Sequence, residues 1–237
     1  MKYSFFYSLF LVLGLTTSSA FAAGNIALIY KGPGACVEEC SEASALIAKM
    51  AGLEPRYVGP NETDPAIFNN AKIWIQPGGF SVDASLAMRP ALKKNLVSFV
   101  ENGGAYVGFC AGGFLATSMI GRSEYPGLGF VPGSTRYFNE VDENGIMVNV
   151  NWKGKTRHLY YEGGPRFDVP QNSGVQILSR YADGSVESLQ TTYGLGRVAV
   201  TGTHPEAPLS WRQSFGLTDR DGLDLDIAVE LVRWAAR

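Results

Sequence analysis

Hydrophobic and polar positions follow two different patterns along this chain, and the change falls near its middle. The first part alternates short apolar runs with stretches of helical periodicity. The apolar runs lie at residues 26–30, 56–58, 71–76 and 105–109, and the helical stretches lie at residues 38–50 and 86–100. Strands that alternate with helices are typical of an open parallel sheet flanked by helices. We therefore predict an α/β fold.

The middle of the chain, residues 127–196, is richer in β-strand signals. Its apolar runs are short and are separated by Gly, Asn, Asp and Pro. We predict antiparallel strands there at residues 146–152, 157–161, 175–181 and 186–193. This segment is interpreted as a β-rich insertion packed against the main sheet. The chain then returns to the sheet at residues 197–201 and ends on an amphipathic helix at residues 223–236.

The N-terminus has the pattern of an export signal. Lys2 precedes an apolar stretch at residues 5–15, and small residues flank Phe21 at a cleavage site of the small-x-small type. We predict a signal peptide at residues 1–22 and a single domain at residues 23–237. The protein is then expected to be secreted across the inner membrane into the periplasm. The apolar stretch is short for a membrane span, so we expect no stable membrane anchor after cleavage.

Composition excludes one class of partner. The 237 residues include 20 basic and 22 acidic ones, and 46% are hydrophobic. A chain of this length forms one or two domains with an ample core. The nearly balanced charge gives no electrostatic reason to expect nucleic acid.

Cys110 lies where a strand meets a helix. The sequence AYVGFCAGGF at residues 105–114 places an apolar run before the cysteine and small residues after it. A strand–turn–helix corner of this kind holds a side chain in a strained and exposed pose, as in the nucleophile elbow of hydrolases. The adjacent helix N-terminus favours the thiolate. We predict that Cys110 is a nucleophile; the alternative is a buried spacer in a glycine-rich turn.

A partner for this thiol follows the next predicted strand of the parallel sheet. The chain has two histidines, His158 and His204, and His204 stands two residues before Glu206. A thiol nucleophile requires a base, and the base requires a group that fixes its tautomer. His204 and Glu206 supply both. His158 is interpreted as structural or exposed. These two histidines and the absence of HExxH and CxxC motifs predict no metal site and no cofactor.

The other two cysteines, Cys36 and Cys40, are four residues apart. In an oxidising compartment they could pair, which would leave Cys110 as the free thiol. The alternative is two reduced, partly buried thiols.

A glycine pair could supply an oxyanion hole. Gly78 and Gly79 follow the apolar run at residues 71–76. Without side chains their amides can face a substrate, and the amide of Ala111 is the natural second donor. In open sheets, functional loops gather at the carboxyl ends of the strands, so these segments are expected to converge on one pocket. The alternative for the glycine pair is a simple turn.

Together these segments resemble the class I glutamine amidotransferase superfamily, whose fold is flavodoxin-like. GFCAG around Cys110, PGG at residues 77–79 and HPE at residues 204–206 carry this resemblance. More narrowly, the chain resembles the family named for the N-terminal domain of some biotin–protein ligases (BPL_N). That resemblance is carried by YKGPG at residues 30–34, GGAYVGFCAG at 103–112, YYEGGP at 160–165 and GTHPE at 202–206.

The resemblance implies an activity and roles for named residues. Cys110 would be the nucleophile, His204 the base and Glu206 its orienting carboxylate, in a triad that acts through a thioester. The amides of Gly79 and Ala111 would form the oxyanion hole. Four residues are expected in the substrate pocket, which are Gly78, Phe114, Tyr161 and Glu162. Phe114 stands where glutamine-using members have glutamine, so a larger or more apolar amide, or a peptide, is expected.

The leading hypothesis is therefore an exported, cysteine-dependent amidohydrolase that acts on a small-molecule or peptide amide. A second hypothesis is a binding module that holds the same ligand without cleaving it. A third is a redox protein in which the Cys110 thiol is oxidised reversibly. The sequence does not specify the oligomeric state or the substrate.

Overall fold

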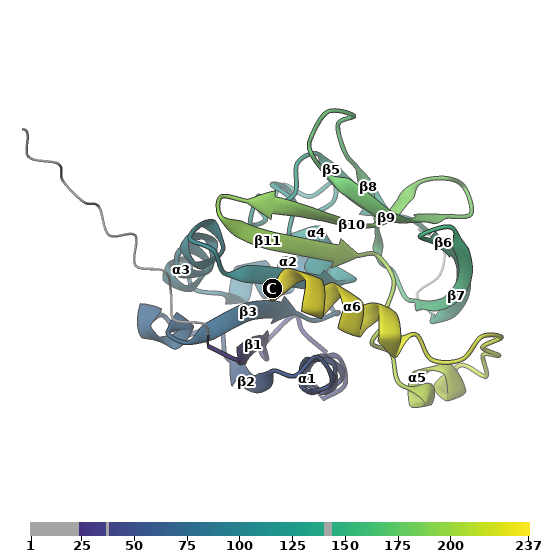
Figure 1. The fold of residues 1–237 in the computed structure, drawn as a ribbon, viewed down its shortest axis with the longest axis horizontal. Helices are drawn as coiled ribbons and strands as arrows, with labels where there is room; N and C mark the ends of the chain where they lie inside the picture. Colours follow the sequence, from purple (N-terminus) through teal and green to yellow (C-terminus); the bar gives the residue numbers. More distant parts are fainter. Residues whose placement is uncertain (1–23, 37, 140–143) are drawn as a thin grey trace, which may run out of the picture.

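Five parallel strands form the centre of the protein. The computed structural model describes residues 24–36, 38–139 and 144–237. The strands follow the order β2-β1-β3-β4-β11 (Figure 1) and pair in parallel. Their bounds are Ile26–Tyr30 for β1, Glu54–Val58 for β2, Ala71–Gln76 for β3, Ala105–Phe109 for β4 and Gly196–Thr201 for β11. Because the strands are parallel, all their carboxyl ends lie at one edge of the sheet.

Helices cover both faces of these strands. Helices α1 (Cys40–Met50) and α6 (Leu225–Ala235) pack together on one face, and α3 (Pro90–Glu101) with the 3₁₀ helix η1 (Pro65–Phe68) lies on the other (Figure 1). Successive strand residues alternate between the two cores. In β1, for example, Ala27 and Ile29 join the core under α1 and α6, whereas Leu28 and Tyr30 join the opposite core. Strands β1, β3, β4 and β11 are buried on both faces, as their apolar sequences predict, whereas the edge strand β2 is largely exposed.

The β-rich segment extends the same sheet. The antiparallel strands β10 (Val186–Tyr193), β9 (Gln176–Tyr181), β6 (Ile146–Trp152) and β7 (Lys155–Tyr161) follow β11 in that order. The short strands β5 (Ser134–Tyr137) and β8 (Pro165–Asp168) pair with each other, and β8 also pairs with β10. The segment is β-rich, as predicted, and lies between β4 and β11 in the sequence; its backbone hydrogen bonds continue the main sheet. The predicted α/β class is confirmed.

Two predicted helices differ from those observed. The helix expected at residues 86–100 is divided into α2 (Ser81–Ala87) and α3, with Arg89 in an extended conformation before Pro90. Proline disfavours helical geometry in the residue that precedes it, which explains the break. A short helix is also expected after Cys110, to about residue 120, but α4 covers only Ala111–Leu115. A further short helix, α5 (Leu209–Ser214), was not predicted.

Two expectations concern the membrane and the N-terminus. None of the helices within the described residues is long and apolar enough to cross a bilayer. The predicted signal peptide, residues 1–22, lies outside the part of the chain that the structure describes.

Candidate active site

A cavity of about 1000 Å³ lies where the parallel strands end, and Cys110 and His204 are on its wall. Cys110 follows β4 and His204 follows β11, its neighbour in the sheet. The loop after β3 brings Gly79 to the same wall. Three of the predicted segments therefore converge at one edge of the sheet, as the strand order requires.

The backbone at Cys110 has the conformation of a sharp corner. Its φ is 47° and its ψ is −104°, a combination that residues with a side chain rarely adopt. The Cys110 N–H donates to the Thr201 carbonyl at 3.0 Å, and the Cys110 carbonyl accepts from the Gly113 N–H at 2.8 Å. The corner also requires Gly108, because a Cβ there would lie 2.4 Å from the Gly112 oxygen. These contacts fix the side chain at the start of α4.

The thiol itself is almost fully buried. Cys110 is the one free cysteine of the described residues and is 3% exposed. Its Sγ donates a hydrogen bond to the Glu162 carbonyl at 3.4 Å. A substrate must therefore enter the cavity to reach this sulfur.

His204 and Glu206 form a buried pair. His204 Nδ1 lies 2.9 Å from Glu206 Oε1, and the side chains are 4% and 0% exposed. The His204 N–H donates to the Tyr160 carbonyl at 2.8 Å, which ties the turn to β7. With Glu206 accepting at Nδ1, the other ring nitrogen is left for proton transfer.

The charges around His204 favour its protonated form. Burial alone lowers the pKa of the ring. The negative charges of Cys110 and Glu206, with hydrogen bonds to both, outweigh burial and raise the pKa of His204 well above its ordinary value. A protonated imidazole beside the sulfur is the partner that a thiolate requires.

A titration can test this assignment. Because the chain contains two histidines, ring NMR signals can be assigned with one His158→Gln variant. We expect His204 to titrate above about 6.5, the ordinary histidine value. Glu206→Gln and Cys110→Ala each remove a negative charge that raises the pKa of His204, so both should lower its midpoint. A midpoint below the ordinary value in the wild type, unchanged in both variants, would contradict the assignment.

The glycine loop after β3 contacts the histidine directly. A Cβ at Gly78 would lie 2.5 Å from His204 Cε1 and 3.2 Å from Cys40 Sγ, so only glycine allows this approach. Among the described residues, neither the Gly79 N–H nor the Ala111 N–H donates to a backbone carbonyl outside regular helix and strand pairing. Gly79 lines the cavity. This arrangement is compatible with the predicted oxyanion hole, whose role stays a prediction.

Cys36 and Cys40 are joined by a disulfide bond, with their Cα atoms 5.1 Å apart. Both line the cavity. Cys36 lies before α1, so no regular helix is strained. The Cys36 N–H also donates to the Gly78 carbonyl at 3.3 Å, and the Phe80 N–H donates to the Gly34 carbonyl at 2.7 Å. The disulfide therefore secures the loop that supports Gly78 and Gly79.

Removing this disulfide should have a moderate effect. The loop that it closes is short, and the chain-entropy estimate for such a loop is about 2 kcal/mol. We expect the Cys36→Ser, Cys40→Ser double variant to lose roughly this much unfolding free energy in urea titrations. It should also react more slowly at Cys110 in thiol labelling, because the glycine loop loses its support. Equal stability and equal labelling would show that the loop holds its position without the bond.

Three predicted pocket residues are not on the cavity wall. Phe114 is buried in the core and contacts Tyr137 edge-on, with ring centroids 5.0 Å apart, and Tyr137 lines the cavity instead. Tyr161 is fully buried, and its hydroxyl donates to the Gly164 carbonyl at 3.0 Å. Gly78 faces His204. Of the four residues, Glu162 alone lines the cavity.

Sequence reasoning placed Tyr161 in the pocket, whereas the cavity is lined by its neighbour Tyr160. Because side chains alternate along a strand, Tyr160 points to the opposite face of β7 and lines the cavity. Its ring lies 5.9 Å from that of His204, and the Trp211 ring on α5 lies 5.4 Å from His204. These two aromatic rings flank the histidine. The two adjacent tyrosines were visible in the sequence, but which of them faces the cavity depends on the register of β7.

Glu187 was also missed. This carboxylate on β10 is fully buried, and its Oε1 accepts hydrogen bonds from both hydroxyls of Thr201 and Thr203 and from the Thr203 N–H. Glu187 thus holds the turn that carries His204. In the sequence it reads as an ordinary polar position of an alternating strand, so no signal distinguished it.

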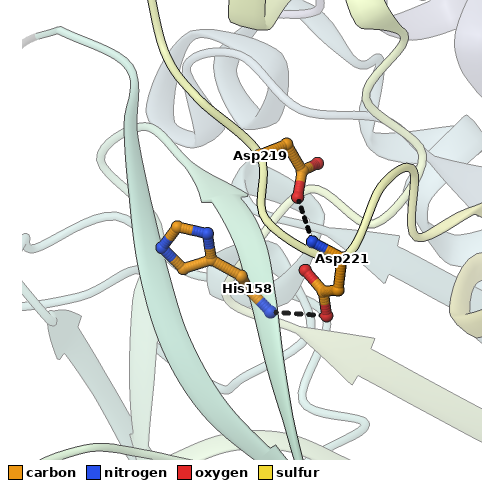
Figure 2. A group of neighbouring side chains, drawn as sticks. All are labelled: His158, Asp219 and Asp221. Carbon is orange, nitrogen blue, oxygen red and sulfur yellow. Dashed lines mark hydrogen bonds between the residues drawn. The ribbon is translucent and has the colours of Figure 1, made fainter.

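His158 lies apart from this cavity. Figure 2 shows it on β7 beside Asp219 and Asp221, which lie between α5 and α6. Candidate ligand atoms of the three residues lie within 4.8 Å of one another. However, Arg212 Nε lies 2.6 Å from Asp219, and Arg157 Nε lies 3.3 Å from Asp221. The two guanidinium groups already balance these carboxylates, which favours a structural role for the group.

The protein has an α/β fold in which a cysteine, a histidine and a glutamate follow neighbouring parallel strands. A crystal structure of a glutamine amidotransferase superposes with a TM-score of 0.61 and 20% identity, and covers 86% of this chain and 99% of that one. A ThuA-like protein from Bacteroides uniformis superposes with a TM-score of 0.53 and 15% identity, over 94% of this chain and 95% of that one. At such identities the similarity establishes the fold.

The sequence comparisons are more specific. Residues 25–125 match the family described as "Biotin-protein ligase, N terminal". The biotin–protein ligase of Schizosaccharomyces pombe is 24% identical in an alignment of 157 residues that covers 56% of this chain and 25% of the ligase. The chain therefore spans about a quarter of the curated relative that it matches. The resemblance predicted from the sequence, to this family on a glutamine amidotransferase-like fold, is confirmed.

Proposed function

We propose that the protein is a cysteine-dependent amidohydrolase that cleaves an amide through a thioester on Cys110. The observation that carries the proposal is the arrangement at the cavity, where a buried thiol, a buried histidine and a buried carboxylate follow neighbouring strands. The raised pKa of His204 also supports it, because a protonated ring can donate to a leaving nitrogen. The disulfide between Cys36 and Cys40 supports export to an oxidising compartment such as the periplasm.

The reaction has two halves, formation of the thioester and its hydrolysis, and Cys110 and His204 act in both. The Cys110 thiolate attacks the amide carbonyl, and the N–H groups of Gly79 and Ala111 stabilise the oxyanion. His204 donates its proton to the nitrogen as the C–N bond breaks, so ammonia or an amine leaves and a thioester remains. Neutral His204 then takes a proton from water, which attacks the thioester. The acid product leaves, and the Cys110–His204 pair is restored. Glu206 holds the imidazole orientation throughout.

The thioester provides the test. The protein is mixed with a panel of primary amides and peptides, quenched in acid and analysed by intact mass. We expect ammonia or amine release, together with a mass increase equal to the acyl group, in the wild type and neither in Cys110→Ala. Hydrolysis that persists in Cys110→Ala would overturn the proposal. Wild-type protein that neither turns over nor acylates with any amide of the panel would also count against it.

A further inference from the structure

The wall of the cavity is acidic. Apart from Cys110 and His204, the ionisable side chains of the described lining residues are those of Glu39, Glu162 and two tyrosines, and no lysine or arginine lines this wall. A ligand cation would be attracted by both carboxylates. A ligand carboxylate would meet the His204 imidazolium, which already pairs with Cys110 and Glu206, and no lysine or arginine among these residues. In a concave site the net negative field is focused rather than dispersed.

Glu162 is held close to the nucleophile. The Glu162 backbone carbonyl accepts a hydrogen bond from the Cys110 thiol at 3.4 Å. The residue that touches the reactive sulfur therefore also carries one of the two carboxylates of the wall. Tyr160 Oη donates to Glu162 Oε2 at 2.7 Å. Burial, and secondarily this hydrogen bond, raises the pKa of Tyr160, so the hydroxyl stays protonated and remains a donor. The hydrogen bond from Tyr160 fixes Oε2 of the Glu162 carboxylate and thereby restricts the position of Oε1.

Aromatic side chains surround the same space. Tyr160 and Trp211 flank His204 within the cavity, while Phe80 is 73% exposed at its wall. Tyr137 and Phe215 are also exposed aromatic residues of this wall. Aromatic faces attract cations and pack against aliphatic groups.

From these observations we infer that the cavity selects amides that carry an ammonium group near the scissile carbonyl, such as amino-acid amides and peptides with a free amino terminus. Glu162, whose backbone carbonyl accepts the thiol, is the specificity-determining residue, and Glu39 adds to the field from the segment before α1. The inference rests on the proposed function for the bond that is cleaved. The charge preference itself follows from the cavity wall.

Charged thiol reagents test this preference without requiring turnover. Cys110 is labelled with aminoethyl methanethiosulfonate, which is cationic, and with sulfonatoethyl methanethiosulfonate, which is anionic. Each forms a mixed disulfide on Cys110 and releases methanesulfinate, and rates are followed by intact mass. Relative to the rate ratio for a free thiol of low molecular weight, we expect about a 10-fold preference for the cation. Glu162→Gln and Glu39→Gln should each reduce it, and the double variant should abolish it.

Glu101→Gln is the matched control. Glu101 is an exposed acid at the end of α3, before β4, and therefore lies at the opposite edge of the sheet. Glu101→Gln should leave the preference for the cationic reagent unchanged, although it changes the net charge of the protein by the same amount as Glu162→Gln. A wild-type ratio equal to that of the free thiol, or a preference for the anion, would overturn the inference. So would equal effects of Glu101→Gln and Glu162→Gln.

Hydrolysis supplies the second measurement. Amino-acid amides are compared with their N-acetyl derivatives, which lack the ammonium charge. We expect Glu162→Gln to lower kcat/KM for the free amine about 10-fold and to leave the acetylated substrate nearly unchanged. Equal losses on both would contradict the inference. If neither substrate is cleaved, the proposed function fails, whereas the reagent ratio still decides the charge preference.

Discussion

Replacing His204 with alanine is expected to reduce amide turnover by at least about 1000-fold. The protonated ring stabilises the thiolate before it attacks, supplies the proton for the leaving nitrogen and later removes one from the attacking water. Glu206 acts through the ring, which it contacts at 2.9 Å. Glu206→Gln should also lower turnover strongly, by as much as roughly 10⁴-fold, because an amide at this position favours the wrong imidazole tautomer. The measurement is the steady-state rate with whichever amide the wild type cleaves.

His158→Gln is the matched control for this prediction. His158 is the second histidine of the chain and does not line the cavity. Its replacement should leave turnover within about two-fold of the wild type, because His158 lies apart from the cavity and its hydrogen bond to Asp221 comes from the backbone N–H, which glutamine retains. Similar losses for His158→Gln and His204→Ala would indicate that neither effect comes from proton transfer at Cys110.

The buried arginine of α5 should produce the largest loss of stability. Arg212 is 1% exposed and pairs with Asp219 at 2.6 Å and with Asp224 at 3.0 Å. Its Nη1 also donates to the Ala207 carbonyl at 2.8 Å, in the turn after His204. Arg212→Met would leave buried carboxylates without this partner. We expect a loss of about 3 kcal/mol or more in unfolding free energy, and a fall in Tm of roughly 6–12 °C.

An exposed ion pair supplies the comparison. Lys153 and Glu230 form a salt bridge in which both side chains are about half exposed. Glu230→Gln should change the unfolding free energy by about 0–1 kcal/mol, because such pairs gain little over solvation. Urea titrations of both variants, with the disulfide intact, measure the difference. If Arg212→Met costs no more than Glu230→Gln, the buried network does not stabilise the turn that carries His204.

Much of the fold could be predicted from local patterns. Residues 71–76, 146–152 and 186–193 were predicted as strands and form β3, β6 and β10 with the same bounds. Apolar runs bounded by turn residues are enough for this. The continuation of the sheet through β10 and β9 was not predicted, because pairing between distant strands leaves no mark within either one. The break before Pro90 was missed because the apolar spacing runs across it.

The site was predicted in part for a comparable reason. Cys110, His204 and Gly79 follow parallel strands, and the parallel arrangement alone places their loops at one edge. Which other side chains line the cavity wall depends on the register of the strands. Tyr160 and Tyr161 are neighbours in the sequence, and a shift of one residue exchanges which of them faces the cavity. Glu187 reaches its position from a strand in the β-rich segment, whose place beside β11 was not predicted.

The central claim is that Cys110 and His204 act as one activated pair, and thiol labelling tests it most directly. Wild type, Cys110→Ala and His204→Ala are treated with iodoacetamide at neutral pH and followed by intact mass. We predict one rapid addition to the wild type, none to Cys110→Ala, and labelling of His204→Ala slowed by roughly 10-fold or more, because an unassisted thiol is only a few per cent ionised at pH 7. Equal rates for wild type and His204→Ala would contradict the account, and would leave a binding module or a simple redox thiol.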